Sequence, residues 1–203
     1  MKNIFCLSCL LASCLIADDV AAFMKKSEVI NFDGKQVGSV DILTPIKILK
    51  SDNNKVDILI EGYTQEYYQE KLVRSHLLNE EYVYFSVDGE KPSYEGDINP
   101  YINIKDKIED KYGEVWFKAE FRATVPKDSI IKDPNKLYLE AKNMYEQTCS
   151  ACHTLHEPTK YTVNQWPSHI ESMISSGFVA LEALNKNMII KYLQHNAKDV
   201  VKK

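Results

Sequence analysis

The chain has 203 residues, of which 44% are hydrophobic, and its formal net charge at pH 7 is −4. This length suits one ordinary domain or two small ones, and the composition excludes collagen-like, coiled-coil and wholly disordered chains. An acidic chain also lacks the basic surface that a nucleic-acid partner requires. Residues 23–131 carry 15 basic and 20 acidic side chains, whereas residues 132–203 carry 9 basic and 7 acidic ones. The uneven charge predicts two units with different surfaces.

The first residues predict a signal peptide, residues 1–22, that directs export to the periplasm. Lys2 is followed by an apolar run from Ile4 to Ala17, with no charge until Asp18. The run is too short to span a bilayer comfortably. Its order of basic, apolar and small residues is that of a secretory signal.

Two processing routes remain open for this signal. The Val-Ala-Ala at 20–22 resembles an ordinary small-residue cleavage site, and Ala17 is another candidate. The Leu-Ala-Ser-Cys at 11–14 resembles a lipobox instead. That route would make Cys14 the lipidated first residue and would tether the protein to a membrane.

Residues 23–130 have the pattern of a β-rich unit. Two runs rich in Ile, Val and Leu, 38–50 and 55–65, are joined by the turn-forming stretch Ser-Asp-Asn-Asn-Lys, which predicts a hairpin. Residues 113–126 alternate between apolar and polar side chains, the period of a strand with one buried face. Several short strands separated by turns predict a small SH3-like β-module.

Residues 131–203 have a helical pattern instead. Two prolines and several polar residues at 126–135 predict the boundary. Beyond it, apolar side chains recur at helical spacing within 137–145, 170–174 and 184–195. An all-helical unit of this size is too small to be stable on its own core and needs a covalent staple.

Residues 149–153 read Cys-Ser-Ala-Cys-His, the signature of covalent haem attachment. Cys149 and Cys152 would add their thiols to the two porphyrin vinyl groups, and His153 would bind the iron as its proximal ligand. The other three cysteines lie in the predicted signal, so no disulfide framework accounts for the pair. We predict one covalent haem c. The predicted fold class is α+β, a small SH3-like β-domain followed by an all-α monohaem cytochrome c domain.

Two other interpretations of the motif are a redox dithiol and a zinc site. A redox dithiol of the thioredoxin type needs a βαβ setting and a cysteine at a helix N-terminus, whereas this pair follows a helix. A zinc site needs two further ligands. His156 and His169 would have to supply them, with a cramped gap before the first. Both interpretations are weaker than haem attachment.

The sixth ligand of the iron must come from another residue. Met173 is our prediction, because it lies twenty residues after His153 on a short predicted helix. A methionine ligand would raise the potential of the iron. His169 is the alternative and would give bis-histidine ligation. The competing role for Met173 is packing in the core, the commoner fate of methionine.

The helical part resembles the C-terminal haem region of the c-type cytochromes that donate electrons to trimethylamine N-oxide reductase. Trp166 stands seven residues before Met173, as in that family, and the closing run Lys-Tyr-Leu-Gln-His-Asn-Ala matches the terminal helix of the family. Residues 38–65 are similar to the β-module that precedes the haem in the same cytochromes. The resemblance covers most of the exported chain, but the multihaem membrane segment of that family is missing, and only one Cys-x-x-Cys-His is present.

The resemblance implies a stand-alone periplasmic monohaem cytochrome c, an electron carrier rather than an enzyme. Its partner would be a molybdenum-cofactor reductase of N- or S-oxides in anaerobic respiration. A quinol-side donor would supply its electrons. The alternative function is that of a haem-containing sensor or a maturation partner of the reductase, in which the β-module would bind the enzyme.

Overall fold

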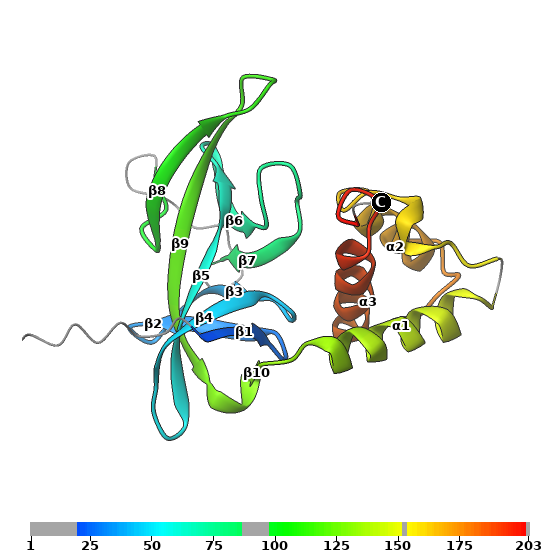
Figure 1. The fold of residues 1–203 in the computed structure, drawn as a ribbon, viewed down its shortest axis with the longest axis horizontal. Coiled ribbons are helices and arrows are strands. Elements are labelled where there is room, and N and C mark those ends of the chain that lie inside the picture. The colour runs from blue at the N-terminus through cyan, green and yellow to red at the C-terminus, as the bar shows by residue number, and fades with distance from the viewer. Residues whose placement is uncertain (1–19, 87–97, 152–153, 202–203) are drawn as a thin grey trace, which may run out of the picture.

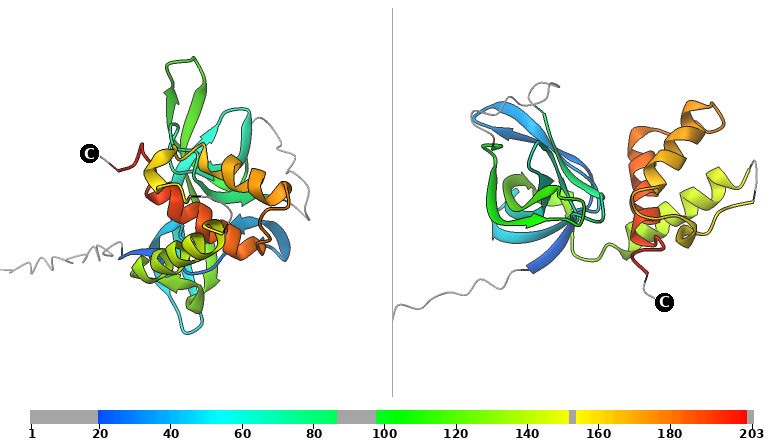
Figure 2. Two further views of the ribbon diagram at one scale, coloured as in Figure 1. Left: turned by 90° about the vertical axis from the view of Figure 1, so that its right-hand side faces the viewer. Right: turned by 90° about the horizontal axis from the view of Figure 1, so that it is seen from above.

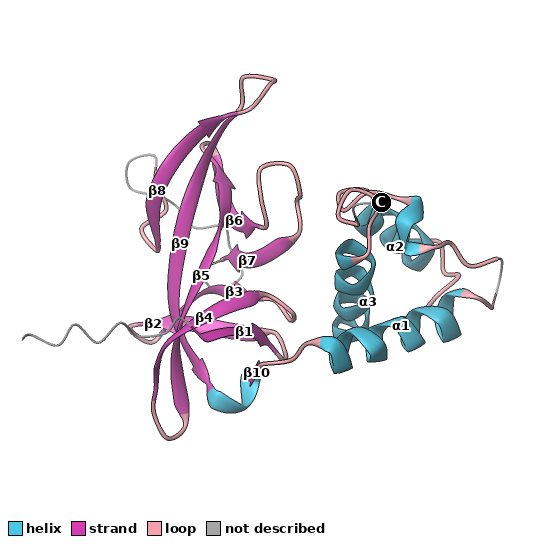
Figure 3. Ribbon diagram, viewed as in Figure 1, coloured by secondary structure: helices cyan, strands magenta, loops and turns pink. Residues whose placement is uncertain are grey.

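The computed structural model describes residues 20–86, 98–151 and 154–201. Within these residues ten strands form one sheet, and three α-helices follow it (Figures 1 and 3). The strands are β1 (Val20–Met24), β2 (Glu28–Phe32), β3 (Lys35–Val40), β4 (Pro45–Ser51), β5 (Lys55–Gln65), β6 (Tyr68–Val73), β7 (Glu81–Phe85), β8 (Ile102–Glu109), β9 (Val115–Pro126) and β10 (Ile130–Ile131). The helices are α1 (Asn135–Cys149), α2 (Trp166–Ser175) and α3 (Ala183–His195), and short 3-10 turns occupy Lys127–Ser129 and Pro158–Lys160.

The sheet is antiparallel throughout and curls on itself (Figure 2). Its strand order is β10-β1-β4-β5-β6-β7-β3-β2, with β9 also paired to β5 and β8 paired to β9. β4 and β5 form the hairpin that the sequence predicts. The longest ladder joins β5 to β9, from Lys55 opposite Pro126 to Gln65 opposite Trp116. β5 and β9 are therefore the two strands that share the most extensive pairing in the sheet.

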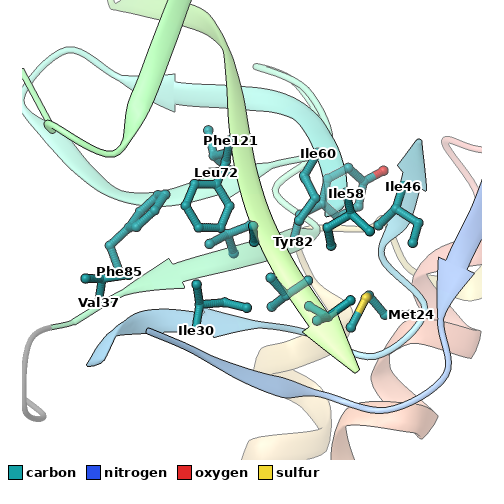
Figure 4. Close-up of a cluster of buried hydrophobic side chains, with 14 of the residues drawn as sticks. Met24, Ile30, Val37, Ile46, Ile58, Ile60, Leu72, Tyr82, Phe85 and Phe121 are labelled. Atoms are coloured by element: carbon teal, nitrogen blue, oxygen red, sulfur yellow. The ribbon is translucent and has the colours of Figure 1, made fainter. Parts of the chain in front are cut away.

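The first hydrophobic core fills the inside of the curled sheet (Figure 4). On β9 the side chains of Phe117, Ala119 and Phe121 are buried and Lys118 and Arg122 are exposed, which follows the predicted alternation, whereas Trp116, on the same face as Lys118, is buried as well. The rings of Phe85 and Phe121 meet edge to face, with centroids 5.1 Å apart. Burial of these apolar surfaces is the main force that closes the curl.

One glycine permits a close approach between two strands. Gly38 on β3 pairs with Phe85 on β7, and a Cβ at position 38 would collide with the carbonyl oxygen of Tyr84. A side chain at this position would push β7 away from β3. Gly38 therefore allows the backbone of β3 to lie close to the backbone of Tyr84 on β7.

The three helices begin and end as their sequences dictate. α1 starts after Pro134, and its first N–H, that of Asn135, donates to the side chain of Asp133 at 3.0 Å. α2 is followed by Gly177, whose positive φ of 73° is a left-handed conformation, and whose N–H donates to the carbonyl of Ile174 at 3.0 Å. Among the helices of the described residues, none has the length and apolar character needed to cross a membrane.

A second hydrophobic core joins the helices to the sheet. Ile42 and Leu43, in the connection from β3 to β4, pack with Leu137 and Ala141 of α1 and Met188 of α3. All five side chains are at most 8% exposed. The helices therefore bury part of their apolar surface on the sheet rather than only on one another.

The fold class predicted from the sequence, a small SH3-like β-domain followed by an all-α monohaem cytochrome c domain, is wrong. The described strands make a single curled sheet of ten, larger than an SH3-like barrel. Helices α1 and α3 share a core with the β3–β4 connection and do not belong to a separate all-α domain. The physical reason is the small size of the helical part, because of which α1 and α3 bury further apolar surface against Ile42 and Leu43.

The predicted domain limits, 23–130 and 131–203, remain predictions. The predicted signal at 1–22 falls mostly outside the described residues, and so does its lipobox cysteine, Cys14. Its last residues belong to β1, because the strand begins at Val20.

Candidate functional site

Cys149, the first cysteine of the motif, is the last residue of α1. Its thiol is free and its residue is only 5% exposed. Leu137, Ala141 and Tyr145 precede it at intervals of four, so the helical period places all four side chains on one buried face. Cys152 and His153 lie outside the described residues, and their roles remain predictions.

The thiol lies in a cluster of apolar and aromatic side chains that all three helices supply. Besides Cys149, the buried members of this Cys149 cluster are Tyr145, Val163, Trp166, Ile170, Ile189, Leu193 and Ala197. Met173 and Leu78 are partly buried and pack against it. The cluster thus brings together the motif, the helix that carries the predicted sixth ligand and the closing helix.

Two hydrogen bonds fix the segment that follows the motif. The hydroxyl of Tyr145 donates to the carbonyl oxygen of His156 at 2.8 Å. The indole Nε1 of Trp166 donates to the carbonyl oxygen of Pro158 at 2.9 Å. Tyr145 and Trp166 also meet edge to face, with ring centroids 6.2 Å apart. These two aromatic residues therefore hold the backbone on the far side of the motif against the cluster.

Tyr161 organises the two histidines near the motif. Its ring stacks on His169, with centroids 3.8 Å apart, and meets Trp166 edge to face at 4.9 Å. The ring of His156 lies 5.5 Å from the same tyrosine. His169 is thus engaged by an aromatic face, whereas Met173 packs on the cluster that contains Cys149. The choice between Met173 and His169 as the second ligand of the iron stays a prediction.

The environment of Cys149 opposes thiolate chemistry. Burial raises the pKa of the Cys149 thiol above its ordinary value of 9.0, because the apolar surroundings disfavour the charged form. Reactive cysteines have the opposite property, a lowered pKa at a partly exposed, electropositive site. The redox-dithiol interpretation therefore finds no support at this cysteine.

The side chains around Cys149 limit the kind of cofactor that the site can hold. Within the described residues, no three His, Cys, Asp or Glu side chains gather as a metal site would require. What the cluster offers is a buried thiol, a nearby thioether and aromatic walls, the donors and surroundings that a covalent haem uses. These residues fit a haem c. Cys149 and Cys152 would hold its vinyl groups, and His153 and Met173 would bind its iron.

Lys191 is a buried charged residue near the candidate site that the sequence analysis does not single out. It is only 2% exposed, and its Nζ lies 3.7 Å from Asp41 and 3.5 Å from Glu80. The ammonium also donates to the carbonyl oxygen of Glu81 and lies 5.3 Å from the ring centroid of Tyr82. Its spacing is the signal that could have found it, because it lies three residues after the buried Met188, on the same helix face.

The loop between β6 and β7 connects the sheet with the Cys149 cluster. Its Leu78 packs against that cluster. The N–H of Asn79 donates to Oδ1 of Asn164 at 2.7 Å, and Nδ2 of Asn164 donates to the carbonyl of Leu77 at 3.1 Å. Asn164 lies two residues before Trp166, so the contact joins the sheet directly to the candidate site.

Comparison with known proteins gives two distant relatives. The cytochrome c-type protein TorC from Escherichia coli O157:H7 and TorC from Escherichia coli strain K12 are each 26% identical to this chain over 173 residues. The match covers 84% of this chain but only 42% of the length of either relative. No family model and no solved structure matches. The chain is therefore a distant relative of c-type cytochromes, in keeping with its motif and with the surroundings of Cys149.

Proposed function

We propose that this protein is a periplasmic monohaem c-type cytochrome that carries electrons. The observation that supports the proposal most is the position of Cys149. It ends a helix inside an apolar and aromatic cluster, and the predicted sixth ligand packs against the same cluster. The distant relationship to cytochrome c-type proteins points the same way.

When bound, the haem supplies a one-electron centre, and the chain sets its environment. Cys149 and Cys152 would hold the haem through their sulfur atoms, and His153 and Met173 would bind its iron. Tyr145 and Trp166 anchor the segment after the motif through its carbonyls and keep its backbone in place. A thioether ligand would favour the reduced iron and would raise its potential.

The proposed electron acceptor is a molybdenum-cofactor reductase of N- or S-oxides, and the proposed donor lies on the quinol side. Both come from the resemblance described above. The chain spans 42% of the length of its TorC relatives, so the function of a whole relative is carried over here only as a proposal. Export through the N-terminal signal, with or without a lipid anchor at Cys14, belongs to the same proposal.

The holoprotein purified from the periplasm tests the cofactor directly. A denaturing gel stained for covalently bound haem should show a stained band for the wild type and none for Cys149→Ala with Cys152→Ala. Met173→Ala should abolish the weak far-red band that sulfur ligation gives to ferric haem. The control Met144→Ala changes a methionine that packs against the same cluster but precedes the motif, and it should leave that band intact.

The acceptor is tested by mixing reduced holoprotein with purified trimethylamine N-oxide reductase and its N-oxide. Rapid reoxidation that requires both components is expected. A colourless protein would refute haem binding. A haem that binds gases and does not pass electrons to the reductase would instead indicate the sensor function.

A further inference from the structure

Helix α2 ends in a tight turn that starts at Met173, the predicted sixth ligand. The N–H of Phe178 donates to the carbonyl of Met173 at 3.2 Å, and the N–H of Gly177 donates to the carbonyl of Ile174 at 3.0 Å. Gly177 has a φ of 73°, a left-handed conformation. Two such bonds around a left-handed residue are the Schellman motif, a common end of a helix. We call residues 173–178 the Met173 turn.

The Met173 turn depends on its backbone, and above all on Gly177. A left-handed conformation is strained for a residue that has a Cβ, and glycine has none. A Cβ added to Gly177 would meet no atom of the described residues within 4 Å. A substitution there would therefore bring backbone strain without a collision. The side chain of Phe178 is 70% exposed, so packing of its ring contributes little to the turn.

The place of Met173 in the helix links the turn to the position of its side chain. Met173 belongs to the last turn of α2, which ends at Ser175. The carbonyls of a last helical turn lack partners within the helix, and helix ends fray. The side chain of Met173 is partly buried and packs against the Cys149 cluster. Fraying of this turn would move the sulfur away from that cluster, so the two bonds of the Met173 turn help to keep it there.

We propose that the Met173 turn positions the sulfur of Met173 for the iron, with Gly177 as the positioning residue. This inference rests on the proposed function and adds a residue outside the haem motif on which iron ligation depends. Methionine has three rotatable side-chain bonds, so its backbone must be held before its sulfur has a defined place. Gly177 acts through the backbone of Met173. Ligation then requires the closed turn, and opening of the turn releases the sulfur.

Two glycines with similar backbone geometry provide the test. Gly177 has a φ of 73°, and Gly113, in the connection from β8 to β9, has a φ of 81°. An added Cβ would meet no described atom within 4 Å at either position. Gly177→Ala and Gly113→Ala therefore introduce comparable strain, and only Gly177 lies beside the predicted ligand. Both variants should lower the thermal unfolding midpoint of the holoprotein to a similar extent.

Imidazole binding to the ferric holoprotein measures how firmly the sulfur is held, because imidazole must displace it. Gly177→Ala should raise the affinity for imidazole about fivefold, the factor that corresponds to the strain of a left-handed alanine. It should also weaken the far-red band. Gly113→Ala should change neither property. Asparagine adopts the left-handed conformation more readily than alanine, so Gly177→Asn should bring both properties back toward those of the wild type.

The outcomes separate this inference from the proposed function. A wild type without covalent haem would refute the proposed function. A wild type with haem whose far-red band survives Met173→Ala would overturn the inference, because Met173 would not bind the iron, and would leave haem binding intact. If the band depends on Met173 but Gly177→Ala and Gly113→Ala bind imidazole equally well, the turn only stabilises the fold, and the inference alone is wrong.

Discussion

The ammonium of Lys191 on α3 lies 3.5 Å from the carboxylate of Glu80 at the end of the β6–β7 loop, and the two side chains are only 2% and 7% exposed. Glu80 also receives a hydrogen bond from Arg74 at 3.3 Å. The pair therefore places opposite charges from the helices and from the sheet in one nearly dry contact. A buried pair of this kind costs much to break, because the remaining partner stays charged away from water.

Replacing Lys191 should accordingly destabilise the protein. Lys191→Met leaves Asp41 without its cation and Glu80 with Arg74 alone, and it is expected to lower the free energy of unfolding by about 3 kcal/mol. Urea unfolding of the holoprotein would measure it. The control Lys142→Met removes an exposed pair with Glu146 within α1, and it should have no measurable effect. Equal effects of the two variants would contradict the role given to Lys191.

The core that joins the helices to the sheet makes a second prediction. Leu137 is 8% exposed and packs with Ile42 and Leu43, whereas Leu139 on the same helix is 57% exposed. Leu137→Ala should cost about 2 to 4 kcal/mol of unfolding free energy, and Leu139→Ala should cost almost nothing. Since the core is shared, the circular-dichroism signals of strands and helices should be lost in one transition when either variant, Leu137→Ala or Leu139→Ala, is unfolded. Separate transitions for the two would contradict a shared core.

A pH dependence follows from His195 at the end of α3. Its ring stacks on Tyr138 at 4.2 Å, and burial lowers its pKa below the ordinary value of 6.5. Arg74 opposes its positive charge, whereas Glu80 favours it. The folded protein therefore prefers the neutral ring. The resulting stability is fully present above pH 6.5 and is lost as the pH falls below that value.

His195→Gln removes this group and should flatten the fall in stability between about pH 7.5 and about pH 5. Thermal unfolding midpoints of both proteins across that range would show the difference. The comparison at the upper end of the range controls for any effect of the substitution itself. Parallel curves for the two proteins would rule out a contribution from His195.

Strand β1 makes a prediction about processing. Val20 pairs with Ile48 on β4, and Ala22 is only 1% exposed in the core of the sheet. Cleavage after Ala22 would remove the first three residues of this strand. The mature protein should therefore begin before Val20, as cleavage at Ala17 or lipidation of Cys14 would allow. Intact-mass measurement of the exported protein checks this, and a mature chain that begins at Phe23 would contradict it.

The sequence predicts local structure better than it predicts the arrangement of the parts. The β4–β5 hairpin, the alternation along β9 and the buried face of α1 follow from side-chain periodicity, which is a local property. The contact of Ile42 and Leu43 with α1 joins residues about a hundred positions apart, and no periodicity encodes it. The sheet is larger than the predicted SH3-like module for the same reason, since pairing between distant strands leaves no local signal.

The candidate site likewise contains residues whose positions the sequence predicts and residues whose positions it does not predict. The spacing of Cys149 after Tyr145 places its thiol on the buried face, so its position could be predicted. The helical spacing of Lys191 after Met188 places it on the buried face, but its partners Asp41 and Glu80 come from the β-part and leave no local signal. The hollow lined by Lys71, Asn79, Tyr84 and Asn164 could not be predicted either. Its lining residues lie far apart in the chain and meet only after α2 and α3 have packed beside the sheet.

The shared core and the Lys191 contacts also affect how the protein can be divided. A fragment that begins at residue 131 would expose Leu137 and Met188 to water and would leave Lys191 without its carboxylates. The complementary fragment would uncover Ile42 and Leu43 and would leave Glu80 with Arg74 as its remaining cation. Each half carries surfaces that only the other half can cover, so work on the haem region requires the whole chain.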